Sequence, residues 1–311
     1  MLKMWKAILT VGVVVSMVAM IMPAQAKDEG RGFTITPPIF ELTANPGDSR
    51  DEIISLYNQG DEDLSITVSV ENLVPFGEAG QVQIVDNSTN DEKLPSLKDW
   101  IKVSKNEFKL KKGATENVDY TLSLPENASP GGHFASIVFS AGSGEISSGG
   151  AGAAAKIGAL ILLTVSGDIN ESAQITEFSP VQKIYLKNGN IDFNLKVENK
   201  GNVYIRPRGF MVINNVFGRK VAQVEVDGKN ILPTATRKIP AQFAGKHLVG
   251  PYTVTLALNY GASNKTLNAT TGFWVIPWIP TLIIVVVLLI IIIFRKRIGK
   301  ALKILFGREN R

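Results

Sequence analysis

Apolar and polar residues alternate in short runs along most of this chain. In the run from Leu64 to Val70, for example, every second residue is apolar. Such alternation is what an antiparallel β-strand with one buried face requires. Similar runs, separated by turns rich in Gly, Pro and Asn, follow one another from Phe33 to residue 273, and no long apolar pattern of helical period interrupts them. The chain is therefore predicted to be all-β up to residue 273.

The predicted strands form two series that resemble each other. ISLYNQGDEDLSITV in the first series echoes FNLKVENKGNVYIRP in the second, and each places Asn-x-Gly directly after an alternating strand. The spacing of strands and turns in both series is typical of a β-sandwich. We predict two tandem immunoglobulin-like β-sandwiches, the first over residues 27–168 and the second over residues 169–273.

A segment rich in Gly, Ser and Ala, AGSGEISSGGAGAAA, runs from Ala141 to Ala155. Its composition also suits an interdomain linker. Both flanking runs, HFASIVFSA and KIGALILLTVSG, are apolar, however, and a lone strand after a linker would need a sheet to join. These flanks favour a long hairpin loop that joins two strands of the first domain.

Residues 274–294, WVIPWIPTLIIVVVLLIIIIF, contain no charged side chain. As a helix with a rise of about 1.5 Å per residue, this run would be roughly 31 Å long, which matches the hydrocarbon core of a bilayer. We predict a single transmembrane helix here, the last element of an otherwise all-β fold. The indole rings of Trp274 and Trp278 suit the headgroup layer at its outer end.

A basic tail, residues 295–311, follows the apolar run and holds seven Lys or Arg residues against one Glu. Basic segments stay in the cytoplasm, so the expected location is the cell membrane, with the N-terminal ectodomain outside and the tail inside. Arg295, Lys296 and Arg297 are the predicted anchors at the inner interface. Apolar residues of the tail also recur at the spacing of one helix face. They are Ile298, Ala301, Leu302, Leu305 and Phe306.

The N-terminus has the features of a secretory signal peptide over residues 1–26. Lys3 and Lys6 precede an apolar run, and Ala24-x-Ala26 is the small-residue pattern that a signal peptidase cleaves. Cleavage is expected after Ala26. Both ends of the chain therefore place the predicted sandwiches outside a membrane.

The net charge of +5 and the pI of 9.2 would suggest a nucleic-acid partner if the charge were spread evenly. The signal peptide carries +2 and the tail +6, so residues 27–294 carry −3. A nucleic-acid partner is therefore not expected. The chain also lacks cysteine, which excludes a disulfide framework, a thiol nucleophile and a thiolate metal site.

Catalytic signatures are missing from the sequence. The two histidines, His133 and His247, each stand beside glycine and are interpreted as loop residues at equivalent places in the two domains. There is no HExxH, GxSxG or glycine-rich phosphate loop. We expect no enzymatic activity, catalytic residue, cofactor or metal, although a hydrolase with only two carboxylates needs no fixed spacing and remains a lower-ranked alternative.

Acidic residues cluster at Asp61-Glu62-Asp63 and between Asp86 and Glu92. Neither cluster has the DxDxDG spacing of a calcium loop, so both are interpreted as solvated turns. Trp100 is the one tryptophan of the ectodomain away from the membrane segment. Its apolar neighbours favour a place in the core, and the alternative is a ring that stacks on a saccharide.

The stretch DWIKVSKNEFKLKKGATENVDYTLSLPENASPGGHFASIVF resembles the first domain of the WxL-interacting protein family of bacterial surface proteins, and the similarity continues through KIGALILLTVSG. The order of signal peptide, two immunoglobulin-like domains, one span and a short basic tail is also similar. The resemblance implies a first domain that binds peptidoglycan or another cell-wall polymer and a second domain that binds secreted surface proteins. The alternative is a structural accessory subunit of a surface complex, or an adhesin, with protein contacts only.

Overall fold

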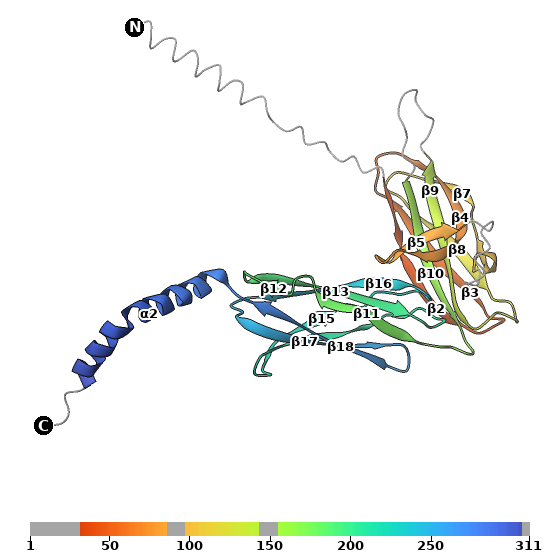
Figure 1. The fold of residues 1–311 in the computed structure, drawn as a ribbon. Coiled ribbons are helices and arrows are strands. Elements are labelled where there is room, and N and C mark those ends of the chain that lie inside the picture. The colour runs from red at the N-terminus through yellow and green to blue at the C-terminus, as the bar shows by residue number, and fades with distance from the viewer. Residues whose placement is uncertain (1–31, 86–96, 143–154, 307–311) are drawn as a thin grey trace, which may run out of the picture.

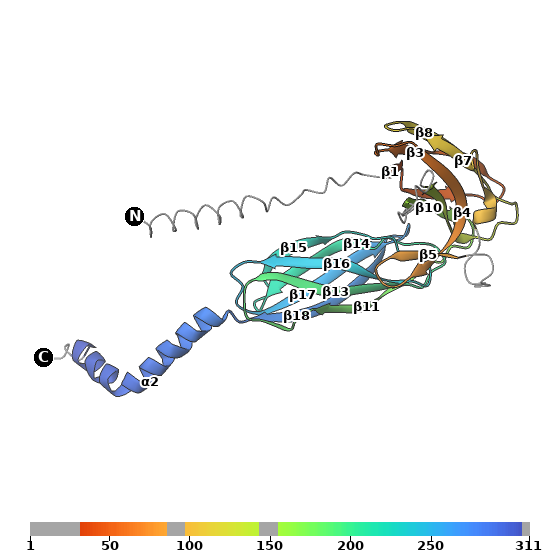
Figure 2. The same ribbon diagram turned by 90° about the horizontal axis from the view of Figure 1, so that it is seen from above.

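The computed structural model describes residues 32–85, 97–142 and 155–306 (Figure 1). The predicted signal peptide with Ala24 and Ala26, the acidic segment 86–92 and most of the glycine-rich segment, 143–154, lie outside the described residues. The described residues form two β-sandwiches and one long helix, as Figures 1 and 2 show. The predicted fold class, two tandem immunoglobulin-like sandwiches followed by one apolar helix, is confirmed.

The first sandwich has one sheet in the order β1-β3-β8-β6 and another in the order β2-β10-β9-β4-β5, with β7 paired to β4. Between the sheets lie the apolar residues that the alternation predicts, including Ile66 and Val68 on β4. The elements are β1 (Phe33–Thr36), β2 (Ile39–Ala44), β3 (Ser49–Asn58), β4 (Leu64–Phe76), β5 (Gln81–Val85), the 3₁₀ helix η1 (Lys98–Trp100), β6 (Ile101–Val103), β7 (Glu107–Leu110), β8 (Thr115–Ser123), β9 (Gly131–Gly142) and β10 (Ala155–Val165).

The glycine-rich segment joins two neighbouring strands of one sheet. β9 and β10 pair antiparallel, and Ala141 lies opposite Ala155 at the end of the ladder. The prediction of a hairpin within the first domain is confirmed, and an interdomain linker at this place is excluded. β10 also pairs with β2, in parallel, which ties the beginning of the sandwich to its end.

The second sandwich has a three-stranded sheet, β11-β13-β16, and a five-stranded sheet, β12-β18-β17-β14-β15. Its core is separate from that of the first sandwich and includes Phe193, Met211 and Phe273. The strands are β11 (Ala173–Pro180), β12 (Ile184–Tyr185), β13 (Gly189–Asn199), β14 (Arg208–Asn215), β15 (Lys220–Val226), β16 (Thr236–Gly245), β17 (Gly250–Tyr260) and β18 (Lys265–Val275).

The apolar helix α2 (Trp278–Phe306) follows β18 almost directly, and residues Trp278–Arg295 are long and apolar enough to cross a membrane. The helix begins at Trp278 rather than at Trp274, because Trp274 still pairs with Pro251 in the β17–β18 ladder. In both views α2 leaves the second sandwich at one end, and the first sandwich lies at the other end (Figures 1 and 2).

Candidate binding cleft at the domain junction

The two sandwiches meet through an apolar patch on the outer face of the β9–β10 sheet. Phe134 on β9 and Leu162 on β10 are buried there together with Leu73 of β4 and Leu232 of the second sandwich. Because side chains alternate along a strand, Phe134 points away from the core that its neighbour Ala135 enters. Burial of these side chains favours a fixed junction over a flexible one.

Hydrogen bonds along one side of the junction connect β2 with the second sandwich. The carboxylate of Glu41 accepts hydrogen bonds from Arg206 and from the side-chain amide of Asn230, the latter at 2.9 Å. Arg206 Nε also donates to Asn230 Oδ1 at 2.6 Å, so the three side chains form one network. Nearby, the backbone N–H of Gly132 donates to the carbonyl of Asn202 at 2.7 Å.

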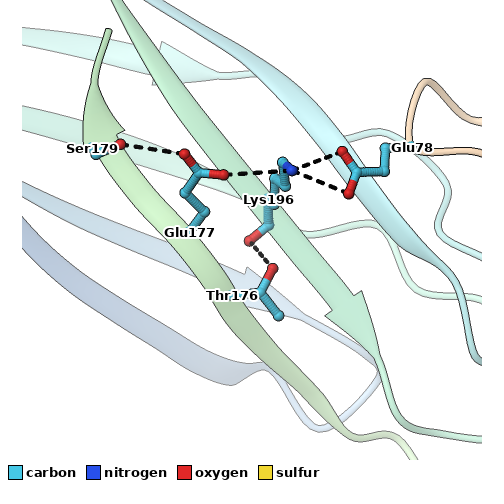
Figure 3. Close-up of polar contacts among 5 residues, drawn as sticks. All are labelled: Glu78, Thr176, Glu177, Ser179 and Lys196. Carbon is cyan, nitrogen blue, oxygen red and sulfur yellow. Dashed lines mark hydrogen bonds and ion pairs between the residues drawn. The ribbon is translucent and has the colours of Figure 1, made fainter. Parts of the chain in front are cut away.

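The turn between β4 and β5 makes the contact on the other side of the junction. Glu78 in this turn lies 2.8 Å from the Nζ of Lys196 on β13, and Glu177 lies 3.5 Å from the same Nζ (Figure 3). The hydrogen bond from Lys196 to Glu78 raises the pKa of the Lys196 ammonium. The Glu78 carbonyl also accepts a hydrogen bond from the backbone N–H of Lys238 at 2.7 Å. A turn of the first sandwich is thereby fixed to two strands of the second.

Arg237 fills the space beside this turn. Its guanidinium lies so close to Gly80 that no Cβ fits at that position without moving it. Nη1 donates to the carbonyl of Asn230, while the buried Nε has no partner among the described residues. Burial lowers the pKa of Arg237. The sequence analysis did not identify Arg237. The one feature that could have indicated it is an arginine within the alternating pattern of β16.

A cleft of about 650 Å³ opens along the Glu41 side of the junction. The first sandwich contributes three side chains to it, and the second contributes most of the rest. The lining includes Glu41, Thr43, Thr164, Glu171, Tyr204, Arg206, Arg208, Asn259, Ser263, Asn264 and Lys265. Hydroxyl, amide and charged groups predominate in this set, so the cleft suits a polar ligand or a polar segment of another protein.

Most charged groups of the cleft are engaged with the protein itself. Glu41 binds Arg206, Glu171 accepts a hydrogen bond from the backbone N–H of Ala262 at 2.8 Å, and Lys265 donates to the Glu171 carbonyl. Arg208, at the start of β14, is exposed and makes no side-chain hydrogen bond or ion pair with any described residue. Its guanidinium is therefore available to a carboxylate or phosphate of a ligand.

Trp100 lies at the end of η1, half-buried against the core of the first sandwich. Its ring packs on His133 with the ring centroids 4.6 Å apart. His133 is a buried residue of strand β9, so its interpretation as a loop residue was wrong. His247 does lie in an exposed turn, and the two histidines are not equivalent. A saccharide contact at Trp100 stays a prediction.

The residues predicted to lie at the membrane interfaces are found around the start of α2 and along it. Trp274 at the end of β18 and Trp278 at the first turn of the helix are both about half exposed. Arg295 is exposed, and the backbone of Lys296 and Arg297 continues the helix. The two tryptophans lie at the end of α2 that adjoins the second sandwich, and their role as membrane anchors stays a prediction.

Asp61 and Asp63, from the first acidic cluster of the sequence, form ion pairs at the surface. Asp61 pairs with Lys112 at 2.8 Å and Asp63 with Lys109 at 3.3 Å. The hydrogen bond from the Lys112 side chain holds the pKa of Asp61 below its usual value, and that from the Lys112 backbone does the same for Asp63. Within residues 32–85, 97–142 and 155–306, no group of three His, Asp or Glu side chains is placed to hold a metal ion.

No protein-family model and no characterised protein sequence matches the chain. Solved structures that it resembles include the class 5 fimbrial chaperone CfaA, at 17% identity and a TM-score of 0.41, over 78% of this chain and 99% of that one. Another is the E. coli chaperone DraB, at 12% identity and a TM-score of 0.37, over 78% and 96%. A third is a chain from the Salmonella enterica SafA pilin–SafB chaperone complex, at 11% identity and a TM-score of 0.37, over 77% and 96%.

Proposed function

We propose that this chain is a membrane-anchored, non-enzymatic binding protein of the cell surface, of the kind that the WxL-interacting resemblance implies. The first sandwich binds peptidoglycan or another cell-wall polymer, and the second contacts surface proteins. Helix α2 holds both at the membrane, with the sandwiches outside and the basic tail in the cytoplasm.

The observation that carries this proposal is the placement of the two sandwiches relative to α2. β18 ends at Val275 and α2 begins at Trp278, so no linker allows the second sandwich to move away from the membrane. The 11 residues of β18 extend over roughly 36 Å at about 3.3 Å per residue. The first sandwich begins at the end of the second that lies away from α2. This placement supports the proposal that the first sandwich is the part that reaches wall polymer.

The cleft supports the part of the proposal that concerns surface proteins. It is lined mainly by the second sandwich, and Arg208 offers a guanidinium without a partner among the described residues. A bidentate ion pair with an acidic side chain would use this group and leave the Glu41–Arg206 network intact. A secreted protein with an exposed Asp or Glu is the ligand class that fits.

Co-sedimentation with purified insoluble cell wall tests the proposal. The full-length protein in detergent should pellet with the wall, and a fragment covering residues 27–168 should pellet while a fragment covering 169–273 stays in solution. Circular dichroism must show that both fragments are folded, since separation exposes Phe134 and Leu162. Pelleting of the second fragment alone would reverse the assignment of the domains. If none pellets, the protein-only accessory role replaces the wall-binding role.

Chemical cross-linking on intact cells tests the cleft. Arg208→Glu should reduce the cross-linked surface proteins at least several-fold and leave wall co-sedimentation unchanged. Lys229→Glu, an equal charge reversal at another exposed position of the second sandwich, is the matched control. If both variants reduced cross-linking equally, binding of surface proteins would depend on net charge alone. The cleft would then no longer be part of the proposal.

A further inference from the structure

Three segments of the second sandwich meet at the end where the chain enters α2. Residues 246–249 lie beside the end of β18, because Gly250 pairs with Val275. The β14–β15 turn lies at the same end, because Asn215 pairs with Tyr252 near the start of β17. The segment from Val181 to Asn188 belongs there too, since Ile184 and Tyr185 pair with Trp274 and Val275.

Most of the exposed large apolar side chains of the second sandwich lie at this end. Between residues 169 and 275, ten large hydrophobic side chains are exposed, and seven of them lie here. Phe217, at the tip of the β14–β15 turn, is 89% exposed, which is the highest value among them. The seven are Val181, Ile184, Leu186, Val216, Phe217, Val249 and Trp274.

The charged residues of the three segments all have one sign. Residues 181–190, 215–220 and 245–250 contain five Lys or Arg residues and no Asp or Glu. Lys220 donates to Gln223 at 3.2 Å, and no ion pair with a described residue engages any of the five. Asp192, which accepts a hydrogen bond from Gln242, lines the same hollow as Ile184 and Lys187 and adds one negative charge at this end. The five residues are Lys183, Lys187, Arg219, Lys220 and Lys246.

Hydrogen bonds fix the segment from Val181 to Asn188 to the start of the helix. Trp274 N–H donates to the Lys183 carbonyl and Ile276 N–H to the Tyr185 carbonyl, both at 2.8 Å. Trp278 N–H, in the first residue of α2, donates to the Leu186 carbonyl at 3.2 Å. Ile184 and Leu186 therefore cannot move away from the point where the chain enters the apolar helix.

We infer that this end of the second sandwich is a membrane-docking surface, which lies in the outer headgroup layer of the bilayer that α2 crosses. Exposed aromatic and aliphatic side chains gain from contact with the acyl boundary, and Lys and Arg beside them reach anionic headgroups. The partner is a lipid surface rather than a protein, because the patch is continuous with the proposed span and its five basic side chains outweigh the carboxylate of Asp192. The inference rests on the membrane anchoring proposed above.

The absence of cysteine from the sequence allows a direct test with the full-length protein. Phe217→Cys is labelled with an environment-sensitive fluorophore, and the protein is reconstituted in nanodiscs that contain lipids spin-labelled near the headgroup. Ser263→Cys, in an exposed turn at the opposite end of the same sandwich, is the control. Quenching should be several-fold stronger at position 217 than at 263, with a blue-shifted emission at 217, and stronger in anionic than in zwitterionic discs.

The outcomes distinguish a failure of the docking surface from a failure of the membrane anchor. Co-elution with discs while the probes at 217 and 263 are quenched equally would overturn the docking surface and leave the anchor in place. Failure to co-elute would overturn both. A probe at 217 that is shielded in detergent in proportion to protein concentration, without quenching by lipid, would assign the surface to a second copy of the chain. Equal quenching in both disc types would overturn the role of the basic residues.

Discussion

Asn58 and Asn199 make the same three hydrogen bonds in the two sandwiches. Each is fully buried at the end of a strand, and its Oδ1 accepts the N–H of the glycine two residues later at 2.9 Å. Each Nδ2 donates to a carbonyl four residues later, Glu62 or Val203, at 2.8 Å. Each also donates to a distant segment, at Leu110 O in the first sandwich and Ile231 O in the second. The repeated Asn-x-Gly is therefore a structural element of both domains.

Replacement of either asparagine should destabilise its sandwich strongly. Asn58→Ala or Asn199→Ala leaves two carbonyls and one N–H without their amide partner, which should cost about 3 kcal/mol of unfolding free energy. Urea unfolding followed by circular dichroism measures the cost. Asn268→Ala, at an exposed position on β18, should change the unfolding midpoint little. Comparable losses for all three variants would contradict a special role for the buried pair.

Gly80→Ala should loosen the domain junction. The new Cβ would overlap the guanidinium of Arg237, which must then leave its contact with Asn230. Spin labels at Lys102 on the first sandwich and Asn268 on the second should report a broader distribution of interdomain distances.

Gly113→Ala is the matched control for this effect. Gly80 and Gly113 both have a positive φ, at 78° and 64°, so both variants have the backbone cost of about 1–2 kcal/mol. A Cβ at Gly113 meets nothing within 4 Å. An equally broad distance distribution in both variants would show that backbone strain, rather than the Arg237 contact, is responsible.

His133 should make the protein less stable in mild acid. Burial lowers the pKa of His133, and its Nδ1 has no hydrogen-bond partner among the described residues, so the native state holds the neutral ring. The unfolded chain binds a proton at a pKa of about 6.5, so unfolding takes up a proton below that pH and native stability falls. His133→Gln should flatten the dependence of the unfolding midpoint on pH below 6.5, and His247→Gln should not.

The tail should bind the inner leaflet. The backbone of α2 continues to Phe306, and the apolar residues from Ile298 to Phe306 recur in the sequence at the spacing of one helix face. A peptide covering residues 295–311 should gain helical circular dichroism with anionic vesicles and little with neutral ones. An equal response to both would limit the basic residues to setting orientation.

The topology should place both sandwiches outside the cell. Protease added to intact, wall-stripped cells should degrade them and leave a small membrane-embedded fragment that carries the tail. An epitope at the C-terminus identifies that fragment. Intact protein in the soluble fraction, or a protected ectodomain, would contradict the predicted orientation.

Sequence reasoning succeeded where the period of apolar residues decides the structure. Alternation on β4 placed Ile66 and Val68 in the core, and both are almost fully buried. It failed at His133, because Gly131 and Gly132 look like a turn. In the structure, Gly131 has a φ of 120° at the first position of β9, and a Cβ at Gly132 would crowd the Asn202 carbonyl and the Phe134 ring. These glycines serve the domain junction and do not end the strand.

The cleft could not be predicted from local patterns. Glu41 and Arg206 meet although 165 positions separate them in the chain, and nothing in the surroundings of either residue indicates the other. The sequence around Arg208 also gave no indication of a binding role, because an exposed arginine in a strand is common. Such contacts depend on how two separately folded sandwiches pack, and side-chain period carries no information about that.

The direct passage from β18 into α2 determines how the protein meets mechanical tension. If the outer sandwich holds the wall while α2 stays in the membrane, growth or turgor pulls along the axis of β18. The bonds of the β17–β18 ladder, from Gly250 to Tyr260, lie across that axis and are loaded together in shear. An optical trap that pulls on the two ends of the chain should find this ladder among the last elements to break. The second sandwich would then act as a mechanically rigid spacer between the wall-bound first sandwich and the membrane.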